Sequence, residues 1–100
     1  DIVFGCLKML VAEQQILADG EALVLPPREY AVLEILLLQA GKVVCKERLA
    51  QRLTSASEAV SDNAIEIYIH RLRKRLDDHG LAIRTLRGLG YVLELPHGGQ

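Results

Sequence analysis

The residues best suited to bind a polyanion are concentrated between positions 61 and 80, where the sequence reads SDNAIEIYIHRLRKRLDDHG. Arginine presents a planar fork of donors that bonds a phosphate or a base edge through two atoms, and lysine offers a compact positive charge. Residues 66–90 contain six Lys or Arg and three Asp or Glu, whereas residues 1–65 contain six and nine. One segment can therefore attract a polyanion although the net charge of the chain is −1. The alternative is that these charges only solvate an exposed helix.

Helical periodicity decides which side chains of this segment face outward. With successive residues about 100° apart, four apolar residues fall on one arc and form a seam for burial: Ile65, Ile69, Leu72 and Leu76. The opposite arc consists of Asn63, Ile67, His70 and Lys74, flanked by Arg71 and Arg73. The sequence therefore predicts a helix over residues 61–79 that is held by one face and offers the other to a partner.

The exposed face has the side-chain types that read double-stranded DNA. The major groove is about 12 Å wide, which admits a helix with its side chains. Arg71 is the predicted reader of guanine, Asn63 can pair with adenine, and Ile67 can pack on a thymine methyl group. The remaining cationic side chains of this face are predicted phosphate contacts, namely His70, Arg73 and Lys74.

Several of these residues also have a simpler structural interpretation. Asn63 can instead cap the helix, with Glu66 reaching back to it. Arg75 lies near the edge of the seam and can pair with Asp78 or Glu66. Tyr68 lies at the boundary of the buried arc, where packing is favoured over DNA contact.

The segments before this helix are predicted to form its scaffold. The first quarter of the chain is typical of short antiparallel strands, with a hairpin at Asp19-Gly20 joining residues 15–17 to residues 23–25. A strongly apolar helix begins near Pro27 and ends before Gly41, with Leu38 among the residues that broaden its buried face. A second, shorter helix is predicted over about residues 46–53, followed by a small polar loop over residues 54–60.

The segment after the basic helix predicts a β-hairpin over residues 83–95. Its apolar residues alternate on both sides of Gly88-Leu89-Gly90, which places Arg87 near the tip. Ile83, Thr85 and Arg87 are predicted to share one face of the first arm, and Tyr91, Leu93 and Leu95 one face of the second. The two glycines do not form a nucleotide-binding loop, because no third glycine and no strand-to-helix crossover follow.

Composition and residue inventory exclude several other classes of protein. One hundred residues, half of them apolar and a quarter charged, are typical of one globular domain, and no apolar run approaches the roughly 18 residues of a membrane span. The sequence has no nucleophile beside a base and no ligand pattern among its histidines, so we expect no enzyme activity, no cofactor and no metal. Cys6 and Cys45 are expected to be free, buried thiols, with a single disulfide as the alternative.

The chain resembles the winged-helix DNA-binding effector domain of OmpR/PhoB-type response regulators over nearly its whole length. The residues that carry the resemblance are LPPREY at 25–30, GKVV at 41–44, NAIEIYIHRLRKRL at 63–76 and TLRGLGY at 85–91. The last two motifs together are highly specific. The resemblance implies an α+β winged helix-turn-helix: a small N-terminal antiparallel sheet, three helices and a C-terminal hairpin called the wing.

The resemblance also implies roles for parts of this fold. The helix over residues 61–79 would enter the major groove, and the wing over residues 83–95 would lie at the minor groove, which Arg87 would enter. Thr85 would join the phosphate contacts. The loop between the second and third helices would contact RNA polymerase through Thr54, Ser55, Ser57 and Glu58.

Further implications of the resemblance concern the whole protein. It would be a cytoplasmic bacterial two-component transcriptional regulator that binds tandem direct repeats of double-stranded DNA as a dimer. A receiver domain, served by a sensor kinase, normally precedes this module, and we expect residues 1–100 to be the effector domain alone.

The sequence departs from the family pattern at three places. Pro26 and Cys45 replace the usual caps of the first two helices, which should weaken each cap by about 1 kcal/mol. Leu53-Thr54 replaces an aromatic residue beside the polymerase-contact loop, which puts that contact in doubt. The acidic overall balance motivates a second hypothesis, in which the fold is a protein interaction module that uses Ile67, Tyr68 and the wing without binding DNA.

Overall fold

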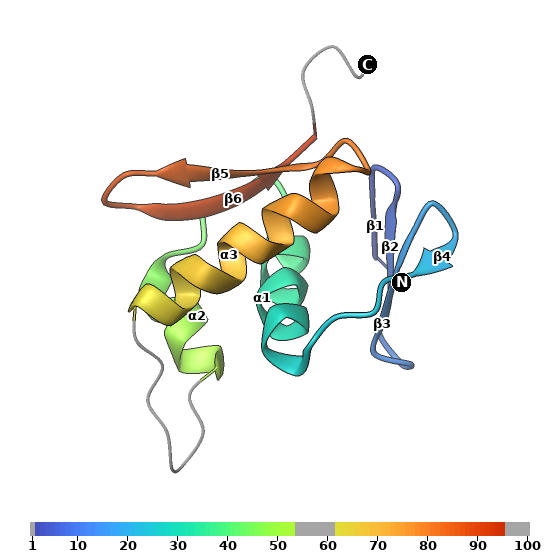
Figure 1. Cartoon of the computed structure of the whole chain (residues 1–100), viewed down its shortest axis with the longest axis horizontal. Coiled ribbons are helices and arrows are strands. Elements are labelled where there is room, and N and C mark those ends of the chain that lie inside the picture. Colours follow the sequence, from blue (N-terminus) through green and yellow to red (C-terminus); the bar gives the residue numbers. More distant parts are fainter. Residues whose placement is uncertain (1, 54–61, 96–100) are drawn as a thin grey trace.

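The chain folds as the expected α+β arrangement of two antiparallel sheets and three helices within residues 2–53 and 62–95, the part that this computed structural model describes (Figure 1). In chain order the elements are β1 Ile2–Phe4, β2 Leu7–Leu10, β3 Gln15–Ala18, β4 Glu21–Ala22, α1 Pro27–Leu38, α2 Lys46–Leu53, α3 Asp62–Asp77, β5 Ala82–Leu86 and β6 Gly90–Glu94. The predicted polymerase-contact residues Thr54, Ser55, Ser57 and Glu58 lie outside the described residues.

The N-terminal sheet is a four-stranded meander in the order β1-β2-β3-β4. The Asp19-Gly20 turn is confirmed, and both residues have positive φ angles, as a tight two-residue hairpin turn requires. The predicted partner segment at residues 23–25 is only partly correct: the second arm is β4, with Ala18 paired to Glu21, and only Leu23 of the predicted segment extends this pairing, through its N–H bond to the carbonyl of Ile16 at 2.9 Å. A two-residue turn fixes the pairing immediately after it, and the chain then leaves the sheet, with Val24 84% exposed.

Helix α1 begins as predicted, with Pro27 in its first turn and Pro26 at the N-cap position without a side-chain hydrogen bond. Its apolar face lies in the core. Leu38, expected to broaden this face, is instead exposed. It follows the buried Leu36 by two residues, or about 200° around the helix, so it points away from the core.

Helix α3 lies across α1 and α2 with its predicted seam fully buried (Figure 1). Ile65, Ile69, Leu72 and Leu76 are each at most 1% exposed. The predicted inward residues of α2, Leu49 and Leu53, are buried as well. No helix within residues 2–53 and 62–95 is long and apolar enough to cross a membrane.

The C-terminal hairpin is confirmed, with Arg87 in the turn between β5 and β6. Burial is uneven within each of the predicted faces. Ile83, Tyr91 and Leu93 are buried, whereas Thr85, Arg87 and Leu95 are exposed. The first arm faces the protein only near its start, and Leu95 lies beyond β6, whose pairing ends where Ala82 meets Glu94.

The wing is fixed to the segment before α2 by a short β-bridge. Val44 and Tyr91 exchange two backbone hydrogen bonds, at 2.7 Å and 2.9 Å. Gly90 permits this approach, because a Cβ atom there would collide with the carbonyl oxygen of Val44. Its φ angle of 139° is also one that other residues rarely adopt.

Both cysteines are free, as expected, but they are not fully buried. Cys6 is half-buried in the turn between β1 and β2, and Cys45 is exposed just before α2. The expectation of buried thiols is therefore wrong. Both residues lie in connections at the surface, where side chains are not enclosed by packed elements.

Gly90→Ala should destabilise the domain by about 3 kcal/mol or more, because the steric clash adds to backbone strain. Gly88→Ala is the matched control: its φ is also positive, but open space surrounds it, so a loss of about 1–2 kcal/mol is expected. Urea denaturation of the two variants measures the difference. Equal losses would contradict the close approach at Gly90.

Candidate nucleic-acid interface

The predicted outward face of α3 is exposed along its whole length. Asn63, His70, Arg71 and Lys74 are exposed, and so is Ile67, at 49%. Ile67 therefore lies outside the core and is accessible to a partner. The helix therefore presents the mixture of basic, amide and apolar groups that the sequence predicted.

Two arginines of α3 converge on a carboxylate from α1. Glu29 is the one buried charged residue among those the structure describes, and its Oε1 lies 3.4 Å from Arg75 Nε. Arg71 Nη1 lies 3.8 Å from Glu29 Oε2, while 60% of the Arg71 side chain stays exposed. The predicted pairing of Arg75 with Asp78 or Glu66 is wrong. Glu29 enters from another element, which helical spacing within α3 cannot reveal.

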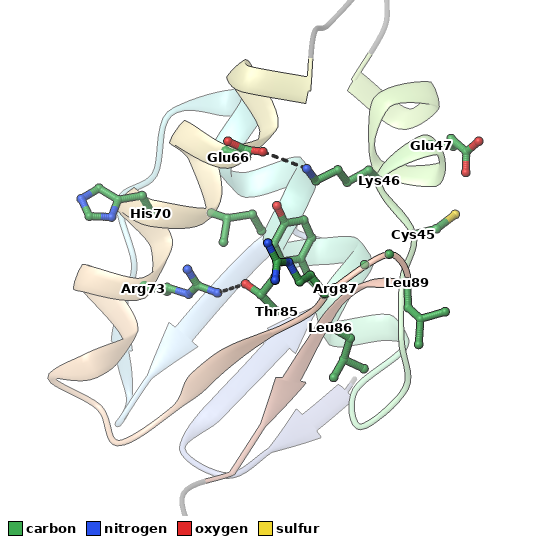
Figure 2. Close-up of a pocket in the computed structure, with 14 residues that line it drawn as sticks. Cys45, Lys46, Glu47, Glu66, His70, Arg73, Thr85, Leu86, Arg87 and Leu89 are labelled. Atoms are coloured by element: carbon green, nitrogen blue, oxygen red, sulfur yellow. Dashed lines mark hydrogen bonds and ion pairs between the residues drawn. The ribbon is translucent and has the colours of Figure 1, made fainter.

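Arg73 connects the helix to the wing. Its Nε donates to the carbonyl of Ile83 at 2.9 Å, and its Nη2 donates to Thr85 Oγ1. Arg73 and Thr85 were both predicted to contact phosphates. The structure gives them an intramolecular bond, which holds the first arm of the wing beside α3 (Figure 2).

A groove of about 790 Å³ separates α3 from the wing and the start of α2 (Figure 2). Its wall on the wing includes Thr85, Arg87 and Leu89, and its helix wall includes His70 and Arg73. Arg87 is exposed at the tip. Three of the predicted cationic residues, His70, Arg73 and Arg87, therefore line one concave surface, whereas Arg71 and Lys74 lie on the helix outside it.

Lys46 also lines this groove, and sequence reasoning had given it no binding role. Its Nζ donates to Glu66 Oε2 at 2.8 Å, and Figure 2 shows the two side chains pointing toward each other from α2 and α3. The sequence did contain one indication of this role, because Lys46 lies at the start of the helix that directly precedes the basic helix. Glu29 was also missed, because an acid in a first turn normally indicates only a favourable dipole interaction.

The competing interpretations of Asn63 and Tyr68 have different outcomes. Helix α3 begins at Asp62, so Asn63 lies inside its first turn rather than at the N-cap position. Glu66, its proposed partner in the cap, bonds Lys46. Tyr68 packs against the core, as predicted, and its hydroxyl accepts a hydrogen bond from Arg28 at 3.2 Å.

Comparison with known sequences gives a consistent set of relatives. Residues 20–93 match the family model described as "Transcriptional regulatory protein, C terminal". The chain is 42% identical over 95 residues to the response regulator protein PmrA of Pseudomonas aeruginosa. That match covers 95% of this chain and 42% of PmrA, so the chain spans about two fifths of the length of this relative.

Solved structures share the fold. The DNA-binding domain of CpxR from E. coli superposes with a TM-score of 0.77 at 29% identity, covering 94% of this chain and 95% of that domain. The DNA-binding domain of RstA from Klebsiella pneumoniae, solved in complex with the RstA box, gives a TM-score of 0.76 at 29% identity. It covers 96% of this chain and 97% of that chain.

Glu29→Gln should lower the free energy of unfolding by about 1–3 kcal/mol, because it leaves a buried amide facing two arginines. Glu34→Gln is the control on the same helix: Glu34, whose side chain is 17% exposed against 2% for Glu29, pairs with the exposed Arg52 at 2.8 Å. Its removal should lower the free energy of unfolding by about 1 kcal/mol or less. Urea denaturation distinguishes the two. If Glu34→Gln lowers the free energy of unfolding as much as Glu29→Gln does, the burial of Glu29 does not make its ion pairs more stabilising than a surface pair.

Proposed function

Because the chain belongs to the family of transcriptional regulatory protein C-terminal domains, a family of regulators rather than enzymes, we propose that it binds specific sequences of double-stranded DNA. The observation that carries the proposal is the exposed basic face of α3 above a fully buried seam. The RstA domain, which has the same fold, was solved with its DNA box, and this supports DNA as the ligand.

In this proposal α3 enters the major groove with its exposed face toward the bases. Arg71 donates to guanine, Asn63 pairs with adenine, and Ile67 contacts a thymine methyl group. His70 and Lys74 lie on the same face and bind phosphates. Their positions along one helix allow base and phosphate contacts to form together.

The wing completes the proposed interface at the adjacent minor groove. Arg87 is exposed at its tip and enters that groove, where a guanidinium is attracted by the negative potential. Arg73 and Thr85 keep the wing beside the helix, and their remaining donor capacity is directed to phosphates. The groove between helix and wing then accommodates one edge of the duplex backbone.

We further propose that the chain is part of a longer, cytoplasmic protein. We propose that residues 1–100 form its effector domain, and that a receiver domain and a sensor kinase control dimerisation on tandem direct repeats. The similarity to PmrA, of which this chain covers 42%, supports that organisation. Contact with RNA polymerase through residues 54–60 belongs to the same proposal.

DNA affinity should fall steeply as salt concentration rises. Each phosphate neutralised by Lys or Arg contributes a slope of about −0.9 in log K against log salt concentration, so three contacts give about −3. Fluorescence anisotropy with a labelled duplex over a salt series measures this slope. Absence of binding to both promoter and random duplexes would instead favour the protein interaction module, with the exposed Ile67 as its contact.

Arg71→Ala should weaken binding to the cognate site by about tenfold or more and affect random duplex much less, because a bidentate base contact discriminates by about 1–3 kcal/mol. Lys74→Ala is the matched control on the same face and should weaken both duplexes equally. A site selected from a random DNA pool supplies the cognate duplex. Equal losses on both duplexes from Arg71→Ala would remove Arg71 from base reading.

A further inference from the structure

Three side chains with metal-binding atoms meet at the end of the molecule where α3 terminates. They are Cys6, Asp19 and His79, and their ligand atoms all lie within 4.8 Å of one another. His79 Nδ1 lies 3.0 Å from Asp19 Oδ2, and the Cys6 thiol donates to the backbone carbonyl of His79 at 3.4 Å. We propose that this cluster is a binding site for a divalent transition-metal ion of the Zn²⁺ type.

The topology of the sheet explains how residues so distant in sequence meet. In an antiparallel meander every second turn lies at the same end, so the β1–β2 turn with Cys6 lies beside the β3–β4 turn with Asp19. The backbone N–H of Asp19 donates to the carbonyl of Cys6 at 3.0 Å and ties the two turns together. The chain leaving α3 passes this end of the sheet (Figure 1) and brings His79 to it.

The chemistry of the donor set selects the class of metal. A thiolate, an imidazole nitrogen and a carboxylate oxygen are ligands of zinc and of neighbouring transition metals, whereas Ca²⁺ and Mg²⁺ require oxygen ligands. In a tetrahedral zinc site such ligand atoms are about 3.5 Å apart, so shifts of about 1 Å are enough to complete the coordination: the more distant atoms approach, and the His79 and Asp19 atoms, 3.0 Å apart, separate slightly. The fourth position would be left to water.

The surroundings permit both entry and such movement. The side chains of Asp19 and His79 are 62% and 23% exposed, and Cys6 is half-buried. Burial, and then the negative charge of Asp19, raise the pKa of the Cys6 thiol.

A metal at this site would join the turn at residue 6, the turn at residue 19 and the end of α3 at residue 79. Cross-linking segments so far apart in the chain constrains the unfolded state, and binding to the folded state adds stability by mass action. The site is distinct from the residues assigned to DNA. Its test therefore succeeds or fails independently of DNA binding.

Co²⁺ and Zn²⁺ are the probes, used on the 100-residue chain with a non-thiol reductant. Co²⁺ should produce thiolate-to-cobalt charge-transfer absorption, and Zn²⁺ at about 100 times its Kd should raise the Tm by roughly 10 °C. Cys6→Ser should abolish the absorption. Asp19→Asn, which suits the positive φ of that turn, and His79→Gln should each weaken Zn²⁺ binding at least tenfold.

Matched controls come from the same chain. Cys45→Ser removes the other cysteine, and His70→Gln removes an exposed histidine of α3; both should retain the absorption and the rise in Tm. Wild-type protein without charge-transfer absorption and without a rise in Tm would overturn the proposal, leaving an ion pair beside a thiol. Loss of the signal in Cys45→Ser or His70→Gln, with Cys6→Ser unchanged, would place the metal elsewhere and also overturn it.

Discussion

The burial of one face of α3 is the constraint on which the rest of the structure depends. Four aliphatic side chains on that face are at most 1% exposed, and each contributes about 1.5–3 kcal/mol when removed from water. A surface ion pair contributes about 0–1 kcal/mol, so apolar contact rather than charge sets the rotation of the helix about its axis. A helix that buries one face must present the opposite face, and here that face is basic.

Intramolecular bonds then restrain the side chains that this rotation exposes. Arg71 lies near the buried carboxylate of Glu29, and Arg73 is bonded to the wing. Such contacts reduce the conformational freedom that a long side chain would lose on binding, which favours affinity through preorganisation. They also compete with an external phosphate for the same donors, so the proposed interface combines restrained cations with exposed ones such as Lys74 and Arg87.

The position of the wing depends on one contact at each of its two arms. The bridge between Val44 and Tyr91 requires Gly90, and Arg73 fixes the other arm of the hairpin from the side of α3. With both arms held, the Arg87 turn extends past one side of the groove beside the helix. The opposite end of α3 meets the N-terminal sheet, where the Cys6, Asp19 and His79 side chains gather. Helix α3 therefore extends from the groove beside the wing to the cluster of Cys6, Asp19 and His79.

The amino-acid sequence by itself determined the elements, because periodicity, turns and caps depend on residues close together in the chain. The seam at Ile65, Ile69, Leu72 and Leu76, the Asp19-Gly20 turn and the tip position of Arg87 all follow from such local rules. Leu38 departed from expectation because it lies on the side of α1 opposite the buried Leu36, and Leu95 because it lies beyond the last paired residue of β6.

Only the tertiary structure decided which polar and charged side chains from different elements come into contact. Glu29 lies beneath two arginines, Lys46 bonds Glu66, and the thiol of Cys6 lies beside His79. The members of these sets are 20 to 73 positions apart in the sequence. Their proximity results from the packing of helices and the order of strands, which no pattern confined to one element encodes.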